Sequence, residues 1–172
     1  MSILTRDEIA REMEAGRIVV EPFQSDQLGP GSVDLHLGDE FRVYQPTRRI
    51  VDVTDDVDYS KLTDWVRMPE GIILMPGETV LGITLEQITL PPDICGWLEG
   101  RSRFARVGLL VHVSASFMQP GISNHQLLEM SNFSPNPLRI VPRTRICQFI
   151  FQRCEGEAVY EGSFRDQGRG NF

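Results

Sequence analysis

Hydrophobic and polar residues alternate with a period of two along much of the chain. Val33, Leu35 and Leu37 alternate with Asp34, a histidine and a glycine, and Phe41 and the following residues continue the pattern. This period places successive side chains on opposite faces of a β-strand. Further short β-type runs lie at 72–75, 79–83, 94–98, 109–113, 126–130, 138–141 and 146–152, separated by turns that contain proline or glycine. Seven or more short strands predict an all-β sandwich or barrel-like domain.

Two segments favour helices. Thr5 to Glu8 has the form of a capping box, and Ile9 and Met13 follow at helical spacing, which predicts a short N-terminal helix. A second short helix is expected at 102–107. The acidic stretch 52–64 indicates a surface excursion. The tail at 162–172 is polar and glycine-rich, so we expect one domain over residues 1–161 and a flexible C-terminal flap over residues 162–172.

Composition narrows the possible functions. The chain has 172 residues, enough for one core, and its net charge of −7 argues against non-specific binding to nucleic acid. No apolar run approaches the roughly 20 residues needed to cross a membrane, and the N-terminal residues lack the pattern of a signal peptide. The three cysteines form no C-x-x-C pair, which fits reduced thiols and predicts a cytoplasmic protein.

The segment Arg101–Arg106 concentrates three arginines and a serine at an expected strand-to-helix junction. Helix N-terminal N–H groups, a hydroxyl and guanidinium groups suit a polyphosphate. A basic turn that pairs with surface carboxylates is an equally good interpretation of the same residues.

Glu129 lies within an otherwise apolar run. A desolvated carboxyl group there could take a proton from water and return it to a leaving group, although a strand glutamate more often faces solvent. The H-x-E and P-C-x-x-C pattern of zinc deaminases is missing, as are a G-x-S-x-G elbow, a P-loop and G-x-G-x-x-G. We therefore expect no zinc or other protein-bound metal site.

Several motifs occur in order along most of the chain and together resemble the dCTP deaminases, relatives of the trimeric dUTPases. They are Pro22-Phe23, GPGSVDLHLG at 29–38, GWLEGRSRFARVGL at 96–109, VHVSA at 111–115, Pro120-Gly121, Leu128-Glu129 with Asn132, RICQF at 145–149, and the flap-like YEGSFRDQ at 160–167. The resemblance implies a dUTPase-like distorted β-barrel or jelly-roll-like subunit, a homotrimer with active sites between subunits, and hydrolysis of dCTP to dUTP and ammonia without zinc.

The resemblance also assigns roles by position. Glu129 is the expected general acid and base, Ser102 and Arg106 are expected to hold the attacking water and polarise the ring, and the carbonyl of Ala115 is expected to face that water. Mg²⁺ would accompany the triphosphate, and dUTP or dTTP could bind as product or inhibitor. The expected substrate-binding residues are Arg101, Arg103, Val113, Gln119, Gln148, Tyr160, Arg165 and Gln167.

Departures from the family pattern leave the product open. Gln119 stands where the family has an aspartate that contacts the sugar and, in dUTPases, helps activate water; an amide cannot act as that base. Arg103 replaces a serine, Ile122 an aromatic residue and Phe164 a tyrosine. We expect deamination that stops at dUTP. The alternatives are a bifunctional enzyme that forms dUMP, a plain dUTPase, and a non-catalytic nucleotide-binding trimer of the same fold.

Overall fold

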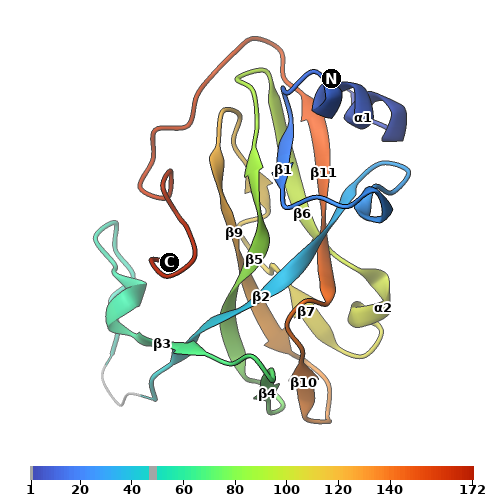
Figure 1. The fold of residues 1–172 in the computed structure, drawn as a ribbon. Helices are drawn as coiled ribbons and strands as arrows, with labels where there is room; N and C mark the ends of the chain where they lie inside the picture. Colours follow the sequence, from blue (N-terminus) through green and yellow to red (C-terminus); the bar gives the residue numbers. More distant parts are fainter. Residues whose placement is uncertain (1, 47–49) are drawn as a thin grey trace.

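The computed structural model describes residues 2–46 and 50–172, and antiparallel strands dominate it (Figure 1). The elements are α1 (Arg6–Glu14), β1 (Val19–Glu21), η1 (Ser25–Gln27), β2 (Val33–Tyr44), η2 (Tyr59–Lys61), β3 (Thr63–Arg67), β4 (Ile72–Leu74), β5 (Thr79–Thr89), β6 (Ile94–Gly100), α2 (Ser102–Ala105), β7 (Leu109–Val111), β8 (Phe117–Met118), β9 (Ser123–Asn132), β10 (Leu138–Ile140) and β11 (Arg145–Arg153).

One strongly curled sheet carries most of the strands. Its order is β7-β9-β5-β2-β11-β6-β8, with β1 paired to β5 and β3 paired to β2, while β10 and β4 form a separate pair. Alternate side chains of β2 and β11 are fully buried, among them Leu35, Phe41, Phe149 and Phe151. Each such side chain contributes roughly 1.5–3 kcal/mol when removed from water, so the alternation in the sequence defines the core. The all-β fold class is confirmed.

A bulge in β5 shapes the centre of the sheet. The register of β5 against β9 shifts between Ile83 and Gln87, so β5 contains more residues than β9 over this stretch. The intervening Thr84 and Glu86 are buried, and the Thr84 hydroxyl accepts a hydrogen bond from the backbone N–H of Gln126 at 2.9 Å. The bulge therefore fixes the position of β9 just before Glu129.

The helices are confirmed in place but differ in detail from the sequence prediction. Thr5 is the N-cap of α1, yet its side chain makes no capping hydrogen bond, so the predicted capping box is wrong. The carboxylate of Glu8 pairs instead with Arg11 and Arg153. The second helix, α2, ends at Ala105 rather than at residue 107, because Gly108 turns the chain at a positive φ of 83°.

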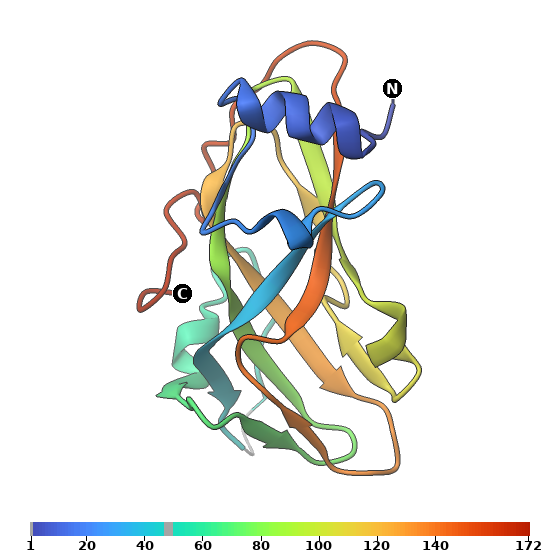
Figure 2. The same cartoon turned by 45° about the vertical axis from the view of Figure 1, so that its right-hand side comes forward.

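The acidic excursion is largely exposed, but it also contains structure that the sequence did not predict. Residues 59–61 form η2, and Thr63 and Asp64 begin β3, which pairs with the end of β2. Figure 1 and Figure 2 both show η2 beside the C-terminal tail. The tail thus meets the excursion, although residues 60 and 170 are far apart in sequence.

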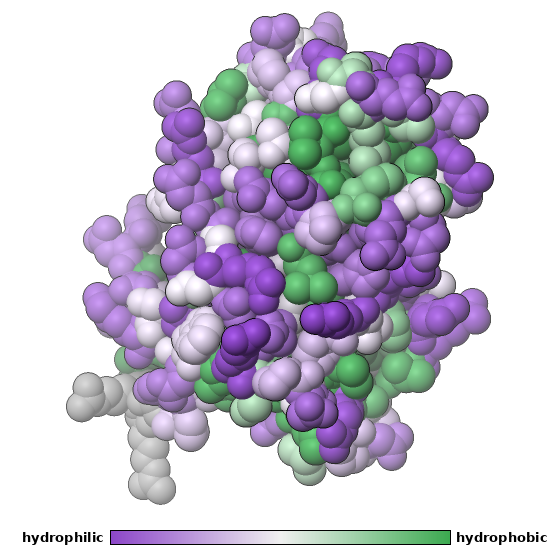
Figure 3. Space-filling view, viewed as in Figure 1, coloured by the Kyte–Doolittle hydropathy of each residue, from purple (hydrophilic) through white to green (hydrophobic). Residues whose placement is uncertain are grey.

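The tail packs against the protein body, and Phe172 is buried. Hydrophilic residues cover most of the face shown in Figure 3, including the side along which the tail runs. The composition of the tail did not suggest a buried anchor. The boundary at residue 161 and the opening of a flap stay predictions.

Candidate active site

A cavity of about 420 Å³ lies between β9, the end of β2, the segment 112–122, η2 and the tail. This volume falls within the range of small-molecule sites. Its walls combine aromatic and amide side chains with one carboxylate, that of Glu129. The lining residues are Tyr44, Tyr59, Leu81, His112, Ala115, Phe117, Met118, Gln119, Ile122, Asn124, Gln126, Leu127, Glu129, Tyr160, Phe164 and Gln167.

Glu129 is held at the cavity wall by its neighbours. Its carboxylate accepts hydrogen bonds from the backbone N–H of Ser114 at 3.1 Å and from the Ser114 hydroxyl at 2.9 Å. Its backbone carbonyl accepts from the N–H of His112 at 2.8 Å. Burial and the nearby negative charge of Glu129 raise the pKa of the Tyr44 hydroxyl. The carboxylate is only partly buried, so one oxygen can face a ligand while Ser114 orients the group.

The carbonyl of Ala115 lies on the same wall and has a defined partner. Nε2 of His112 lies 2.7 Å from the Ala115 oxygen. Because a carbonyl only accepts, this contact requires the proton on Nε2. His112 also adopts a positive φ of 61°, which is uncommon for a residue with a side chain. The backbone around Ala115 is therefore held in a specific shape beside Glu129.

The arginine segment lies elsewhere on the molecule. Ser102, Arg103 and Arg106 are exposed on or beside α2, and none of them lines the cavity. Figures 1 and 2 show α2 on the opposite side of the molecule from the tail. Within this chain, the structure therefore does not bring Ser102 and Arg106 together with Glu129.

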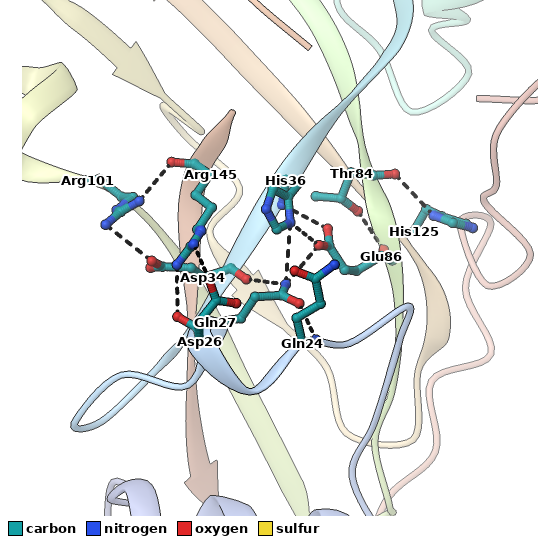
Figure 4. A network of polar contacts seen from close by, with 10 residues as sticks. All are labelled: Gln24, Asp26, Gln27, Asp34, His36, Thr84, Glu86, Arg101, His125 and Arg145. Carbon is teal, nitrogen blue, oxygen red and sulfur yellow. Dashed lines mark hydrogen bonds and ion pairs between the residues drawn. The ribbon is translucent and has the colours of Figure 1, made fainter. Parts of the chain in front are cut away.

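Arg101 is part of a polar network on the outer side of β2 (Figure 4). Its guanidinium lies 3.2 Å from the Asp34 carboxylate and donates to the carbonyl of Arg145 at 3.1 Å. Gln148 lies nearby on β11 and accepts a hydrogen bond from the Ser32 hydroxyl at 3.0 Å. Neither Arg101 nor Gln148 lines the cavity, as is also true of Ser102, Arg103 and Arg106, which we call the α2 group.

The remaining predicted substrate-binding residues divide between cavity and solvent. Gln119, Tyr160 and Gln167 line the cavity, whereas Val113 and Arg165 are exposed and do not. Sequence reasoning missed Tyr44, Tyr59, His112 and Ser114 as wall or orienting residues. The motif VHVSA contains two of these, but the two tyrosines carry no local signal because their position depends on how the excursion folds.

Among residues 2–46 and 50–172, no group of three or more His, Cys, Asp or Glu side chains could hold a metal ion. In the same described ranges, no helix is both long and apolar enough to cross a membrane.

Comparison with known proteins identifies relatives over nearly the whole chain. A family model described as dCTP deaminase-like matches residues 3–154. The chain is 39% identical to "dCTP deaminase, dUMP-forming" from Parafrankia sp. (strain EAN1pec), with 96% of this chain and 86% of that protein aligned. It is 42% identical to the protein of the same name from Mycolicibacterium vanbaalenii, with 92% and 84% aligned.

Among solved structures, 2'-deoxycytidine 5'-triphosphate deaminase from Agrobacterium tumefaciens superimposes with a TM-score of 0.69 at 21% identity. The match covers 89% of this chain and 48% of that one, so the chain spans about half the length of that protein. This likeness supports the fold. The motifs resembling the dCTP deaminases, the family-model match and the relatives at about 40% identity agree, and the chain belongs to the dCTP deaminase-like family.

Proposed function

We propose that the protein hydrolyses dCTP to dUTP and ammonia without zinc. The observation that carries this proposal is Glu129, oriented by Ser114 on the wall of a cavity of nucleoside size in a chain of this family. The relatives are named as dCTP deaminases, which supports the same reaction here.

The chemistry follows from one carboxylate beside the cytosine ring. Glu129 takes a proton from water as the oxygen attacks C4, and this step forms a tetrahedral centre. The carboxyl group gives this proton to N3, then takes the proton of the new C4 hydroxyl and gives it to the amine, so that the C4–N bond breaks, the C4 carbonyl forms and ammonia leaves. The sum is dCTP plus water giving dUTP plus ammonia. The Ala115 carbonyl, held by His112, accepts a hydrogen bond from the water and helps to position it.

The α2 group would complete the site from a neighbouring subunit of a homotrimer. Ser102 and Arg106 are exposed and distant from the cavity of their own chain, as a residue that serves a neighbour must be. Arg103 and Arg165 are exposed guanidinium groups that suit the triphosphate. Mg²⁺ would enter with the substrate and be held by phosphate oxygens and water, since the described residues offer no acidic cluster for it.

A second candidate is the bifunctional reaction that forms dUMP and pyrophosphate, and the names of the relatives favour it. Gln119 opposes it. This amide lies on the cavity wall at the position where the resemblance implies an aspartate. It can hydrogen-bond a sugar hydroxyl but cannot take the proton of a water attacking the α-phosphate. We therefore place dUTP ahead of dUMP as the product.

Ammonia and pyrophosphate should be measured together, with dCTP, CTP and dUTP as substrates in Mg²⁺ after chelation of zinc. Ammonia from dCTP without pyrophosphate supports the proposal. Both products in equal amounts support the bifunctional enzyme, and pyrophosphate from dUTP alone supports a dUTPase. Binding of dCTP without either product supports the non-catalytic trimer. Glu129→Gln should bind dCTP and release no ammonia, and full activity in this variant would refute the mechanism.

A further inference from the structure

The C-terminal tail is fastened at a point outside the cavity. The ring of Phe172 is only 1% exposed, and the guanidinium carbon of Arg42 lies 5.9 Å from its centroid. Nε of Arg42 also donates to the backbone carbonyl of Phe172. The same guanidinium also lies 5.6 Å from the ring centroid of Tyr59 in η2. Arg42 thus contacts both the tail and the acidic excursion.

Ion pairs with two residues near the middle of β2 reinforce this attachment. Arg169 in the tail lies 2.6 Å from one oxygen of Asp39 and 3.1 Å from the carboxylate of Glu40. The backbone N–H of Gly170 donates to the other oxygen of Glu40. Asp39 binds a second cation, Arg67 of β3, through its other oxygen at 2.8 Å. Arg67 makes no contact with the tail among the described hydrogen bonds and ion pairs, so it offers a matched control.

The segment before this attachment closes the cavity. Phe164 and Gln167 line it, and both are tied to β9. Asn124 donates from its side chain to the carbonyl of Phe164 at 2.9 Å. The side chain of Gln167 donates to the carbonyl of His125 at 2.9 Å, and the N–H of His125 donates back to the Gln167 carbonyl at 3.2 Å. The tail therefore runs as a strap from β9 to the end of β2.

We propose that Arg42 and Phe172 form a latch that holds two walls of the cavity, Tyr59 of the excursion and Phe164 of the tail, against a bound nucleotide. The latch rests on the proposed function, because it deepens the account of the same cavity. Both residues are positioning residues: they act through Tyr59 and the tail, since neither lines the cavity itself.

The physical reason lies in the composition of the tail. Residues 162–172 include two large apolar side chains, and only Phe172 is buried, whereas Phe164 is 52% exposed. Ordering a glycine-rich polar segment costs conformational entropy, and its exposed hydrogen bonds compensate little for that cost. Burial of one phenyl ring beside a cation adds hydrophobic and cation–π attraction to the partly exposed ion pairs of Arg169.

Limited trypsin digestion followed by mass spectrometry tests the latch without nucleotide. Cleavage after Arg165, which is exposed in the tail, reports opening of the strap. Phe172→Ala and Arg42→Gln should raise the rate of this cleavage about tenfold, which corresponds to about 1.4 kcal/mol. Phe172→Leu should restore most of the protection, and Arg67→Gln should leave it unchanged. Equal cleavage in the wild type and in Phe172→Ala would overturn the latch, as would equal loosening by Arg67→Gln.

Steady-state ammonia release then tests whether the latch positions substrate. Phe172→Ala and Arg42→Gln should raise KM for dCTP about tenfold with kcat changed less than twofold, the signature of lost binding rather than lost chemistry. An unchanged KM in a variant whose tail is cleaved faster would overturn the positioning role. A wild-type protein that releases no ammonia would refute the proposed function and the positioning role together, while the digestion would still decide whether the latch exists.

Discussion

The buried contact between His36 and Glu86 offers a quantitative test of what holds the site-bearing strands together (Figure 4). Glu86 lies in the β5 bulge with 1% of its surface exposed. Its carboxylate accepts from Nδ1 of His36 at 2.6 Å, from the His36 backbone N–H at 2.8 Å and from the Gln27 side chain at 2.8 Å. His36→Ala removes the imidazole and leaves the other two donors in place.

The expected cost follows from the charge and burial of the acceptor. A hydrogen bond to a charged group is worth about 1.5–3 kcal/mol, and stripping a buried ion of its partner costs up to about 3–5 kcal/mol. Two donors to Glu86 remain after His36→Ala, so we expect a loss of about 2–3 kcal/mol in the free energy of unfolding. For a chain of this size, the midpoint of thermal unfolding should fall by roughly 4–12 °C.

A double-mutant cycle with Glu86→Leu separates the contact from the lost volume. Urea unfolding of the wild type, both single variants and the double variant gives the coupling energy, which we expect to be about 2 kcal/mol. The reasoning requires His36→Ala to be much less costly once Glu86 is leucine. An equal cost in both backgrounds, or a cost below about 0.5 kcal/mol in the wild type, would show that the carboxylate gains nothing from the imidazole.

Three further outcomes are expected. Ser114→Ala removes one donor from Glu129 and should lower kcat for ammonia release about fivefold, since a hydrogen bond contributes about 1 kcal/mol; an effect on KM alone would contradict the orienting role. Gln119→Asp restores a carboxylate to the cavity wall and should add pyrophosphate release from dCTP, whereas continued release of ammonia alone would show that this side chain does not set the product. Burial holds the pKa of His125 below its usual 6.5, so the unfolded chain binds the proton more readily. The contribution of neutral His125 to the free energy of unfolding is therefore full above pH 6.5, and it should be lost as the pH drops toward the lower folded pKa. Urea titrations at several pH values check this, and His125→Gln should remove that part of the dependence of stability on pH.

The strands were predictable because every second side chain of a strand points toward the core. Val33, Leu35 and Leu37 must all point inward, and the structure buries all three. The prediction of β5 stopped at residue 83, although the strand continues to Thr89. The cause is the bulge, where the buried polar residues Thr84 and Glu86 interrupt the alternation. The alternation of polar and apolar residues alone cannot distinguish a buried polar residue with hydrogen-bond partners from a polar residue in a turn.

The candidate site was predictable where a motif carries it and obscure where distant segments meet. Glu129 was found from its motif, and the structure places it in the cavity with Ala115. Tyr59 reaches the same cavity through a fold of the acidic excursion that no local pattern specifies. Phe172 lies in a polar segment, where a lone aromatic residue gives no period. It is buried in contact with Arg42, 130 residues away, so only the three-dimensional structure could reveal it.

We propose that one side chain, Gln119, decides the product that overall similarity leaves open. The aligned relatives carry names that include formation of dUMP, and they share about 40% of their residues with this chain. Deamination in the proposed mechanism needs a proton carrier at C4, and Glu129 supplies it. In the same proposal, release of pyrophosphate needs a second base, and Gln119 on the cavity wall offers only an amide. We propose that this exchange of a carboxylate oxygen for nitrogen removes the second step and leaves the first intact, and measurement of the product in this protein tests the proposal.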